Sequence, residues 1–235
     1  MSDRHLSTQF DAELSGISTR VLEMGGIVES QVARSVYALT QFSSEVAAEV
    51  LATEARVNAT EVEIDRDLST IIARRQPTAR DLRLLIAISK TIANLERVGD
   101  EAARIARTVQ RLVNSGVSSR LRLPVNDLAY ESELAVSQLR KALDAFARLD
   151  VDRAIEVLKA DDLIDQEFEG LLRKLITFMM EDPRTISSAL DTLWVAKAIE
   201  RIGDHAKNIA EYVIYVVEGR DIRHSKPTLG EPPVL

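Results

Sequence analysis

The sequence contains one motif twice. Residues 94–106 read NLERVGDEAARIA and residues 198–210 read AIERIGDHAKNIA, so seven residue identities recur at a constant offset of 104. Upstream, residues 51–58 match residues 158–165 at an offset of 107, and Pro77 matches Pro183 at an offset of 106. These offsets differ only by small insertions or deletions near the connections. The chain is therefore predicted to consist of two copies of one structural unit.

Each copy has the pattern of three long helices. Apolar residues recur every three or four positions in 79–115 and 184–218, as they do in a helix that buries one side. Prolines 77, 124 and 183 fall between such segments, where a residue without an N–H group can end or start a helix. The predicted helices span residues 7–41, 44–75, 79–115, 125–149, 151–181 and 184–218.

These helices predict an all-α fold of two tandem, pseudo-symmetric three-helix bundles. The short connections predict antiparallel neighbours. We expect a first repeat at residues 1–120, a second at 121–219 and a flexible tail at 220–235. The tail is proline-rich and shows no hydrophobic period, which is typical of disorder.

Composition excludes several classes of protein. The 235 residues contain no cysteine, which excludes disulfides, thiolate metal sites and a cysteine nucleophile. A net charge of −7 and only 4% aromatic residues argue against nucleic-acid binding. No signal peptide and no apolar stretch long enough for a membrane span is visible. We therefore expect a cytoplasmic protein with no direct membrane span.

Acidic pairs spaced four residues apart are the candidate site. Such residues share one helix face, and neighbouring helices could bring several carboxylates together to bind a hard cation, iron, manganese or zinc. Glu61 and Asp65 extend one of these faces and are alternates, and Asn58 replaces a carboxylate in the first copy. The predicted metal ligands are Glu96, Asp100, Glu200, Asp204, Asp161, Asp165, Glu54 and Asn58.

The two copies of the motif also share a glycine and an arginine. A glycine costs roughly 1 kcal/mol in a helix interior, so Gly99 and Gly203 indicate close approach of a neighbouring backbone or a ligand. Arg97 and Arg201 could bind an anion or pair with acids of a neighbouring helix. His205 has Glu101 as its repeat counterpart and receives no role. The competing interpretation of the acidic pairs is an ordinary solvated helix face.

No catalytic motif is present. Walker, Rossmann, kinase and nucleophile-elbow signatures are absent, and so is the Glu-x-x-His of ferritin-type di-iron proteins. The sequence is thus predicted to encode a binding and signalling protein and not an enzyme.

The repeated LERVGD and IERIGD segments resemble the PhoU family of phosphate-transport accessory proteins. The resemblance runs from about Ser7 to His224 and includes residues 10–26, 74–92, 142–154 and 179–186. It implies two similar three-helix bundles, commonly dimeric, whose Glu/Asp-x-x-x-Asp motifs hold iron or zinc; magnesium or manganese are alternatives.

The resemblance also implies a function. Family members repress the phosphate-starvation regulon, couple the phosphate ABC transporter ATPase to a sensor histidine kinase, and restrain uptake. Two alternatives remain beside it: a metal-binding or storage protein with carboxylate-bridged metal, and a metal-free acidic adaptor.

Overall fold

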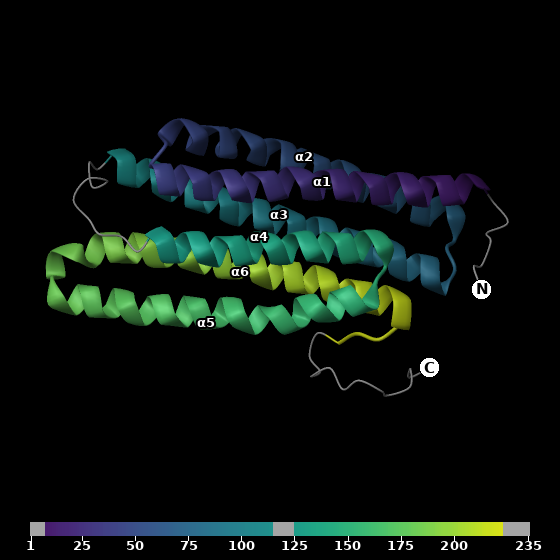
Figure 1. The fold of residues 1–235 in the computed structure, drawn as a ribbon. Helices are drawn as coiled ribbons and strands as arrows, with labels where there is room; N and C mark the ends of the chain where they lie inside the picture. Colours follow the sequence, from purple (N-terminus) through teal and green to yellow (C-terminus); the bar gives the residue numbers. More distant parts are fainter. Residues whose placement is uncertain (1–7, 115–124, 223–235) are drawn as a thin grey trace.

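The computed structural model describes residues 8–114 and 125–222, in which six long helices form two units of three (Figure 1). The all-α fold predicted from the sequence is confirmed, and every helix end falls within two residues of its expected position. Where the sequence predicted a helix from residue 184, a short 3₁₀ turn precedes the last helix. The helices are α1 (Thr8–Gln41), α2 (Ser44–Arg75), α3 (Ala79–Asn114), α4 (Val125–Arg148), α5 (Val151–Glu181) and α6 (Ile186–Glu218), with η2 at Pro183–Thr185.

The repeat extends to the turn between the first two helices of each unit. Phe42 and Leu149, at the offset of 107, both adopt the left-handed conformation, with φ of 49° and 50°. The next residues, Ser43 and Asp150, cap α2 and α5 by accepting hydrogen bonds from backbone N–H groups. The same turn conformation thus reverses the direction of the chain in both units.

The second turn of each unit contains the repeated proline. In the first unit Gln76 ends α2 in a left-handed conformation, and the Thr78 hydroxyl donates to Asp81 Oδ2 at 2.7 Å as α3 begins. In the second unit Asp182 caps η2, whose first residue is Pro183. The proline at the start of a helical segment has no N–H group to leave unsatisfied.

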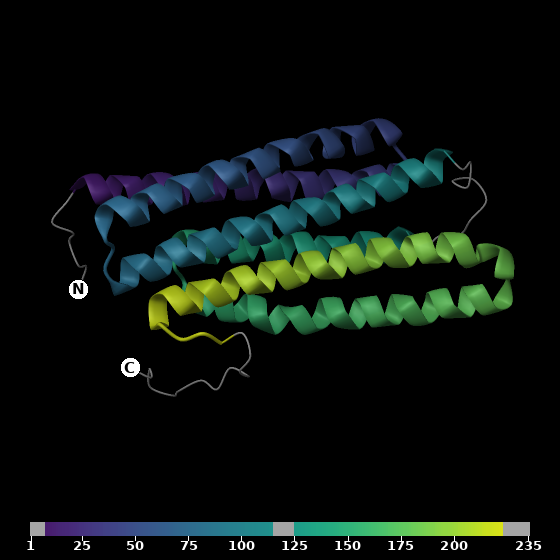
Figure 2. The ribbon, with the colours of Figure 1, turned by 180° about the vertical axis from the view of Figure 1, so that it is seen from behind.

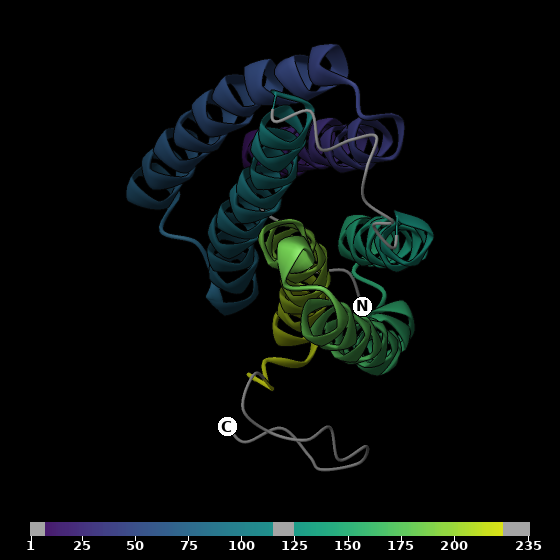
Figure 3. The ribbon, with the colours of Figure 1, turned by 90° about the vertical axis from the view of Figure 1, so that its left-hand side faces the viewer.

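The two units pack through their first and third helices. Figures 1 and 2 show α3 beside α6 and α1 beside α4, whereas α2 and α5 lie on opposite outer sides. Seen from the end, the units form two separate groups of three helices (Figure 3). Buried aliphatic side chains from all six helices form one continuous core. Both copies of the repeated motif therefore lie where the units meet.

The third helices run antiparallel along this seam. Arg83 near the start of α3 reaches the Val216 carbonyl near the end of α6, and Arg111 near the end of α3 pairs with Asp191 near the start of α6. On the neighbouring helices, Arg140 of α4 donates to Glu29 of α1. The two units are consequently related by an approximate two-fold axis, in addition to being tandem in sequence.

Two further expectations concern the ends of the chain and its hydropathy. Ile222, within the predicted tail, is buried against the core, and the tail beyond it lies outside the described residues, as does the predicted boundary at residue 120. Among the described helices, none has the length and apolar character needed to cross a membrane.

Candidate functional site

A buried glutamine organises the centre of the first unit. Gln31 on α1 is 1% exposed, and its Nε2 donates to Glu54 Oε2 at 2.8 Å and to the Val50 carbonyl at 3.3 Å. Both side chains lie against Gly99 on α3, where a Cβ atom would come within 3.1 Å of Glu54 Oε2 and 3.2 Å of Gln31 Oε1. The sequence predicted close approach of a neighbouring backbone or a ligand at this glycine, but the atoms that approach it belong to the side chains of Glu54, Gln31 and Val57.

The second unit repeats this arrangement. Gln138 Nε2 donates to Asp161 Oδ1 at 3.3 Å and to the Val157 carbonyl at 3.2 Å. A Cβ atom on Gly203 would lie 2.9 Å from Ile164 Cδ1 and 3.0 Å from Gln138 Oε1. Neither glutamine was predicted from the sequence, although Gln31 and Gln138 are separated by the same offset of 107 as the matched acidic segments.

Acidic side chains of α2 and α3 gather beside this centre in the first unit. Burial raises the pKa of Glu54; the Gln31 hydrogen bond opposes this rise, and a hydrogen bond with Asp100 and the nearby Glu96 charge add to it. Burial also raises the pKa of Glu61, as do the charges of Glu96 and Asp65. Helices α2 and α3 therefore bring these carboxylates close enough for their charges to raise one another's pKa values.

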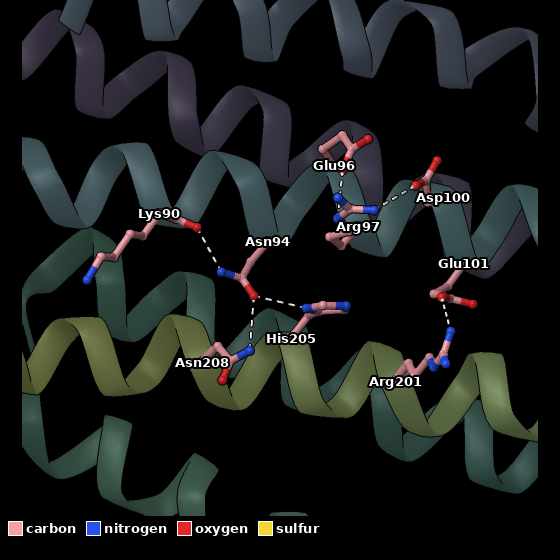
Figure 4. A network of polar contacts seen from close by, with 9 residues as sticks. All are labelled: Lys90, Asn94, Glu96, Arg97, Asp100, Glu101, Arg201, His205 and Asn208. Carbon is pink, nitrogen blue, oxygen red and sulfur yellow. Dashed lines mark hydrogen bonds and ion pairs between the residues drawn. The ribbon is translucent and has the colours of Figure 1, made fainter. Parts of the chain in front are cut away.

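Few cations neutralise this first group. Arg97 lies 3.5 Å from Glu96 Oε2 and 3.6 Å from Asp100 Oδ2, on its own helix (Figure 4). Asn58, with its amide turned to suit its neighbours, donates to Glu54 Oε1 at 3.1 Å. Asp65 accepts a hydrogen bond from Ser89 at 3.2 Å.

Lysines neutralise the second group. Lys207 donates to Asp161, which is 3% exposed, and Lys197 donates to Glu200 Oε1 at 2.6 Å. At the repeat positions of these lysines the first unit has alanines 103 and 93. Because alanines replace these lysines, less of the negative charge of the first acidic group is neutralised than of the second.

Two further acids complete the second group. Burial, followed by the charges of Glu200, Asp161 and Asp165, raises the pKa of Asp204 to about 6. Burial likewise raises the pKa of Asp165, with Asp161 adding to the effect. All four acids predicted for this unit thus influence one another across α5 and α6.

Glu131 on α4 is a buried acidic residue that was not among those predicted from the sequence. It is 1% exposed, and neither of its carboxylate oxygens has a hydrogen-bond partner. Burial raises its pKa to about 8, and the charges of Glu200 and Glu167 contribute. Its repeat counterpart is Met24, a buried core residue, so Glu131 has no acidic equivalent that a repeat comparison could have found.

The oxygen atoms suit a hard cation by chemical type, since a bound cation would offset the burial and the mutual repulsion that together raise these pKa values. Their arrangement does not bring them to one point: in residues 8–114 and 125–222, no group of three or more His, Asp or Glu side chains is placed to hold a metal ion. Ligation by the predicted residues, including Glu54 and Asn58, stays a prediction.

Polar side chains also meet across the seam between the units (Figure 4). Arg201 of α6 donates to Glu101 Oε1 of α3 at 3.2 Å, and Glu101 is 5% exposed. This contact is one of the two roles that the sequence left open for the arginines. Glu101 also attracts Arg104, whose Nε lies 3.4 Å from Glu101 Oε2.

His205 belongs to a second polar cluster along the same seam. Its Nδ1 lies 2.9 Å from Asn94 Oδ1, which also accepts from Asn208 Nδ2 at 3.1 Å. Because an amide oxygen only accepts, Nδ1 carries the proton. Burial, together with the charges of Arg97 and Arg201, lowers the pKa of His205 to about 4, so the ring is neutral at pH 7.

Comparison with known proteins places this architecture among characterised chains. The PhoU domain family model matches residues 21–109 and 130–213. A Burkholderia protein named phosphate-specific transport system accessory protein PhoU homolog is 47% identical over 227 residues, which cover 97% of this chain and 96% of the relative. The Escherichia coli K12 accessory protein PhoU is 46% identical over 222 residues, covering 94% of this chain and 90% of the relative.

Solved structures agree with the sequence matches. The crystal structure of PhoU from Pseudomonas aeruginosa superposes with a TM-score of 0.84 at 45% identity, covering 90% of this chain and all of the other. A phosphate transport system regulatory protein PhoU from Streptococcus pneumoniae gives a TM-score of 0.83 at 27% identity, covering 90% and 98%. The similarity therefore includes both three-helix units.

Proposed function

This chain belongs to the PhoU family, and we propose that it is an accessory protein of a phosphate-specific transport system. In this proposal it represses phosphate-starvation signalling and restrains uptake when phosphate is abundant. It does so in the cytoplasm, as a homodimer, by linking the ATPase of the phosphate ABC transporter to a sensor histidine kinase.

The observation that carries this proposal is the extent of the similarity. Relatives named as accessory proteins align over 94% to 97% of this chain, so the assignment does not depend on one shared motif. The relatives' names describe an accessory role and no reaction, which supports action by binding. Long helical faces are suited to contacts with other helical proteins.

Deletion of the gene in its host tests the regulatory proposal. We expect phosphate-starvation genes to be expressed in phosphate-rich medium after deletion, and repression to return when the gene is supplied on a plasmid. A reporter fused to a starvation-induced promoter measures both. Unchanged reporter activity in the deletion strain would overturn the proposal.

Metal binding is a second proposed property, and the repelling carboxylates of α2 and α3 favour it. The proposed ligands are those predicted from the sequence, with iron or zinc as the expected metals and magnesium or manganese as alternatives. Elemental analysis of protein purified without chelators tests it. If the purified protein contains no detectable metal, the acidic groups do not bind metal and this proposal is wrong.

The metal-free alternative makes the acidic groups a surface for basic patches on a partner. The weak compensation of Glu61, Glu96 and Asp100 in the first unit supports it. Binding to the kinase or the ATPase would then weaken as salt rises, because salt screens exposed charges. A pull-down at low and high salt, with metal-depleted protein, distinguishes this role from metal binding.

A further inference from the structure

A cavity of about 640 Å³ lies along the seam between the two units. It is lined from α3 and α6 by four basic and four acidic side chains, together with His205 and Asn208. The lining is thus formally neutral in a chain that carries a net charge of −7. Such a place repels an anion less than the rest of the molecule does.

The approximate two-fold axis provides an internal comparison for this cavity. Exchanging repeat positions at the offset of 104 converts Arg201 into Arg97 and Glu101 into His205. On one side of the axis, Arg201 donates to the buried carboxylate of Glu101. On the other side, Arg97 and the His205 imidazole occupy the equivalent positions, so no carboxylate faces Arg97 there. One carboxylate of a symmetric pair is therefore replaced.

Arg97 consequently has no hydrogen-bonded acceptor among the described residues. Its nearest carboxylate oxygens lie at 3.5 and 3.6 Å, beyond the usual range for a charged hydrogen bond. Its side chain is 66% exposed and lines the cavity. A guanidinium group with unused donors suits carboxylate or phosphate groups, which accept two parallel hydrogen bonds from it.

We propose that this cavity binds an oxyanion of the phosphate class, with Arg97 as its principal ligand. The anion takes the role toward Arg97 that the Glu101 carboxylate has toward Arg201. Arg201 lines the same cavity and adds positive charge from the facing helix. The volume admits inorganic phosphate as well as larger phosphate esters, since ligand cavities commonly measure about 300–1,000 Å³.

The acidic residues of the lining do not fill this role. Glu101 is held by Arg201 and Arg104. Asp100 reaches Arg97 only at 3.6 Å and lies on the same helix, one turn away. A bound oxyanion would face the donors of Arg97 that these carboxylates leave unused. The proposal concerns the purified chain and does not depend on the regulatory role proposed above.

Calorimetric titration of the full chain tests the proposal. The protein is first passed over a chelating resin, so that anions cannot bind through a metal. Inorganic phosphate, pyrophosphate and adenosine triphosphate are the three probes, and their relative affinities distinguish a free phosphate site from a phosphate-ester site. We expect binding that Arg97→Gln weakens about tenfold or more, as the loss of a charged hydrogen-bond pair does.

Two variants make the test specific. Arg184→Gln removes the same charge from an arginine that does not line the cavity: it lies in the turn between α5 and α6, pairs with Asp182 and has a 90% exposed side chain, and its substitution should leave binding unchanged. His205→Glu restores the missing carboxylate of the symmetric pair, which should pair with Arg97 and abolish anion binding. The thermal midpoint of this variant checks that the protein is still folded.

Several results would overturn the proposal. These are the absence of binding at millimolar concentrations of all three probes, equal weakening by Arg97→Gln and Arg184→Gln, or undiminished binding in a folded His205→Glu protein. Equal weakening would identify a general charge effect, and undiminished binding would place the anion elsewhere.

Discussion

Nε2 of Gln31 and Oε2 of Glu54 meet at 2.8 Å, and both side chains rest against the backbone of Gly99. The pair joins all three helices of the first unit at one level. The second unit pairs Gln138 with Asp161 in the same way, but the side chains that lie against Gly203 are those of Gln138 and Ile164. The glycines of the repeated motif are thus the places where the third helix accommodates side chains of the other two.

Alanine normally stabilises a helix relative to glycine, but at these glycines we expect alanine to lower the free energy of unfolding. Gly203→Ala places a methyl group 2.9 Å from Ile164 Cδ1, and we expect a loss of about 1–3 kcal/mol in the free energy of unfolding through overpacking. Gly170→Ala, a helix-interior site with no atom within 4 Å of the new Cβ, should gain up to about 1 kcal/mol. Urea denaturation measures both, and a gain at Gly203 would contradict the proposed packing.

The buried carboxyl of Glu131 should make stability depend on pH. Its folded pKa of about 8 exceeds its ordinary value of 4.5, so its contribution is complete below pH 4.5 and is lost as pH rises toward 8. Between pH 5 and 7.5 this group alone should reduce the unfolding free energy by about 3 kcal/mol. Glu200 and Glu167 are the acids that face it.

Glu131→Met isolates this effect, because methionine occupies the equivalent buried position in the first unit. The difference in unfolding free energy between the variant and the original chain should grow with pH over this range. Denaturant titrations at several pH values measure it. A difference that is constant with pH would show that Glu131 keeps an ordinary pKa in the folded protein.

The Arg201–Glu101 contact should stabilise the association of the two units. Glu101→Gln removes a buried negative charge that pairs with two arginines. We expect the free energy of unfolding to fall by about 1–3 kcal/mol. A double-mutant cycle with Arg201→Gln separates the pair from its surroundings. The exposed Arg184–Asp182 pair is the control, with an expected coupling of about 0.5 kcal/mol or less. Equal coupling in the two pairs would mean that burial at the seam adds nothing.

If the protein binds metal, the first unit should bind it more strongly. Lys207 and Lys197 compete for the carboxylates of the second unit, whereas alanines stand at the equivalent positions of the first. The double substitution of Glu96→Gln with Asp100→Asn should therefore reduce metal content more than the matching changes at Glu200 and Asp204. Elemental analysis of both variants checks this, and the reverse order would refute the electrostatic argument.

The helices and the two units could be predicted because their signals are local or repeated. Pro77 and Pro183 mark equivalent turns, and the apolar period of α3 and α6 determines which side is buried. The antiparallel seam could not be predicted in this way, because nothing in the spacing of one helix specifies which residues of the other unit it meets. Arg201 and Glu101 are 100 residues apart and come together only through the packing of the units.

The same distinction explains the candidate site. The acidic pairs on α3 and α6 were visible as residues four positions apart, and the structure brings them beside α2 and α5 as expected. Their neutralisation by Lys197 and Lys207 depends on how long side chains cross between helix faces. Glu131 could not be predicted because a single acidic residue on an otherwise apolar helix face forms no repeated spacing. Its raised pKa results mainly from its burial, which only the packing of the helices determines.

The seam relates the units as an isologous interface relates two subunits of a dimer. In a true homodimer every substitution appears on both sides of the axis, so Glu101 could not have been retained on one side while histidine stood on the other. Joining both units in one chain removes that constraint. The binding stoichiometry expected for the seam is accordingly one anion per chain, and each copy of the motif is free to acquire a separate task.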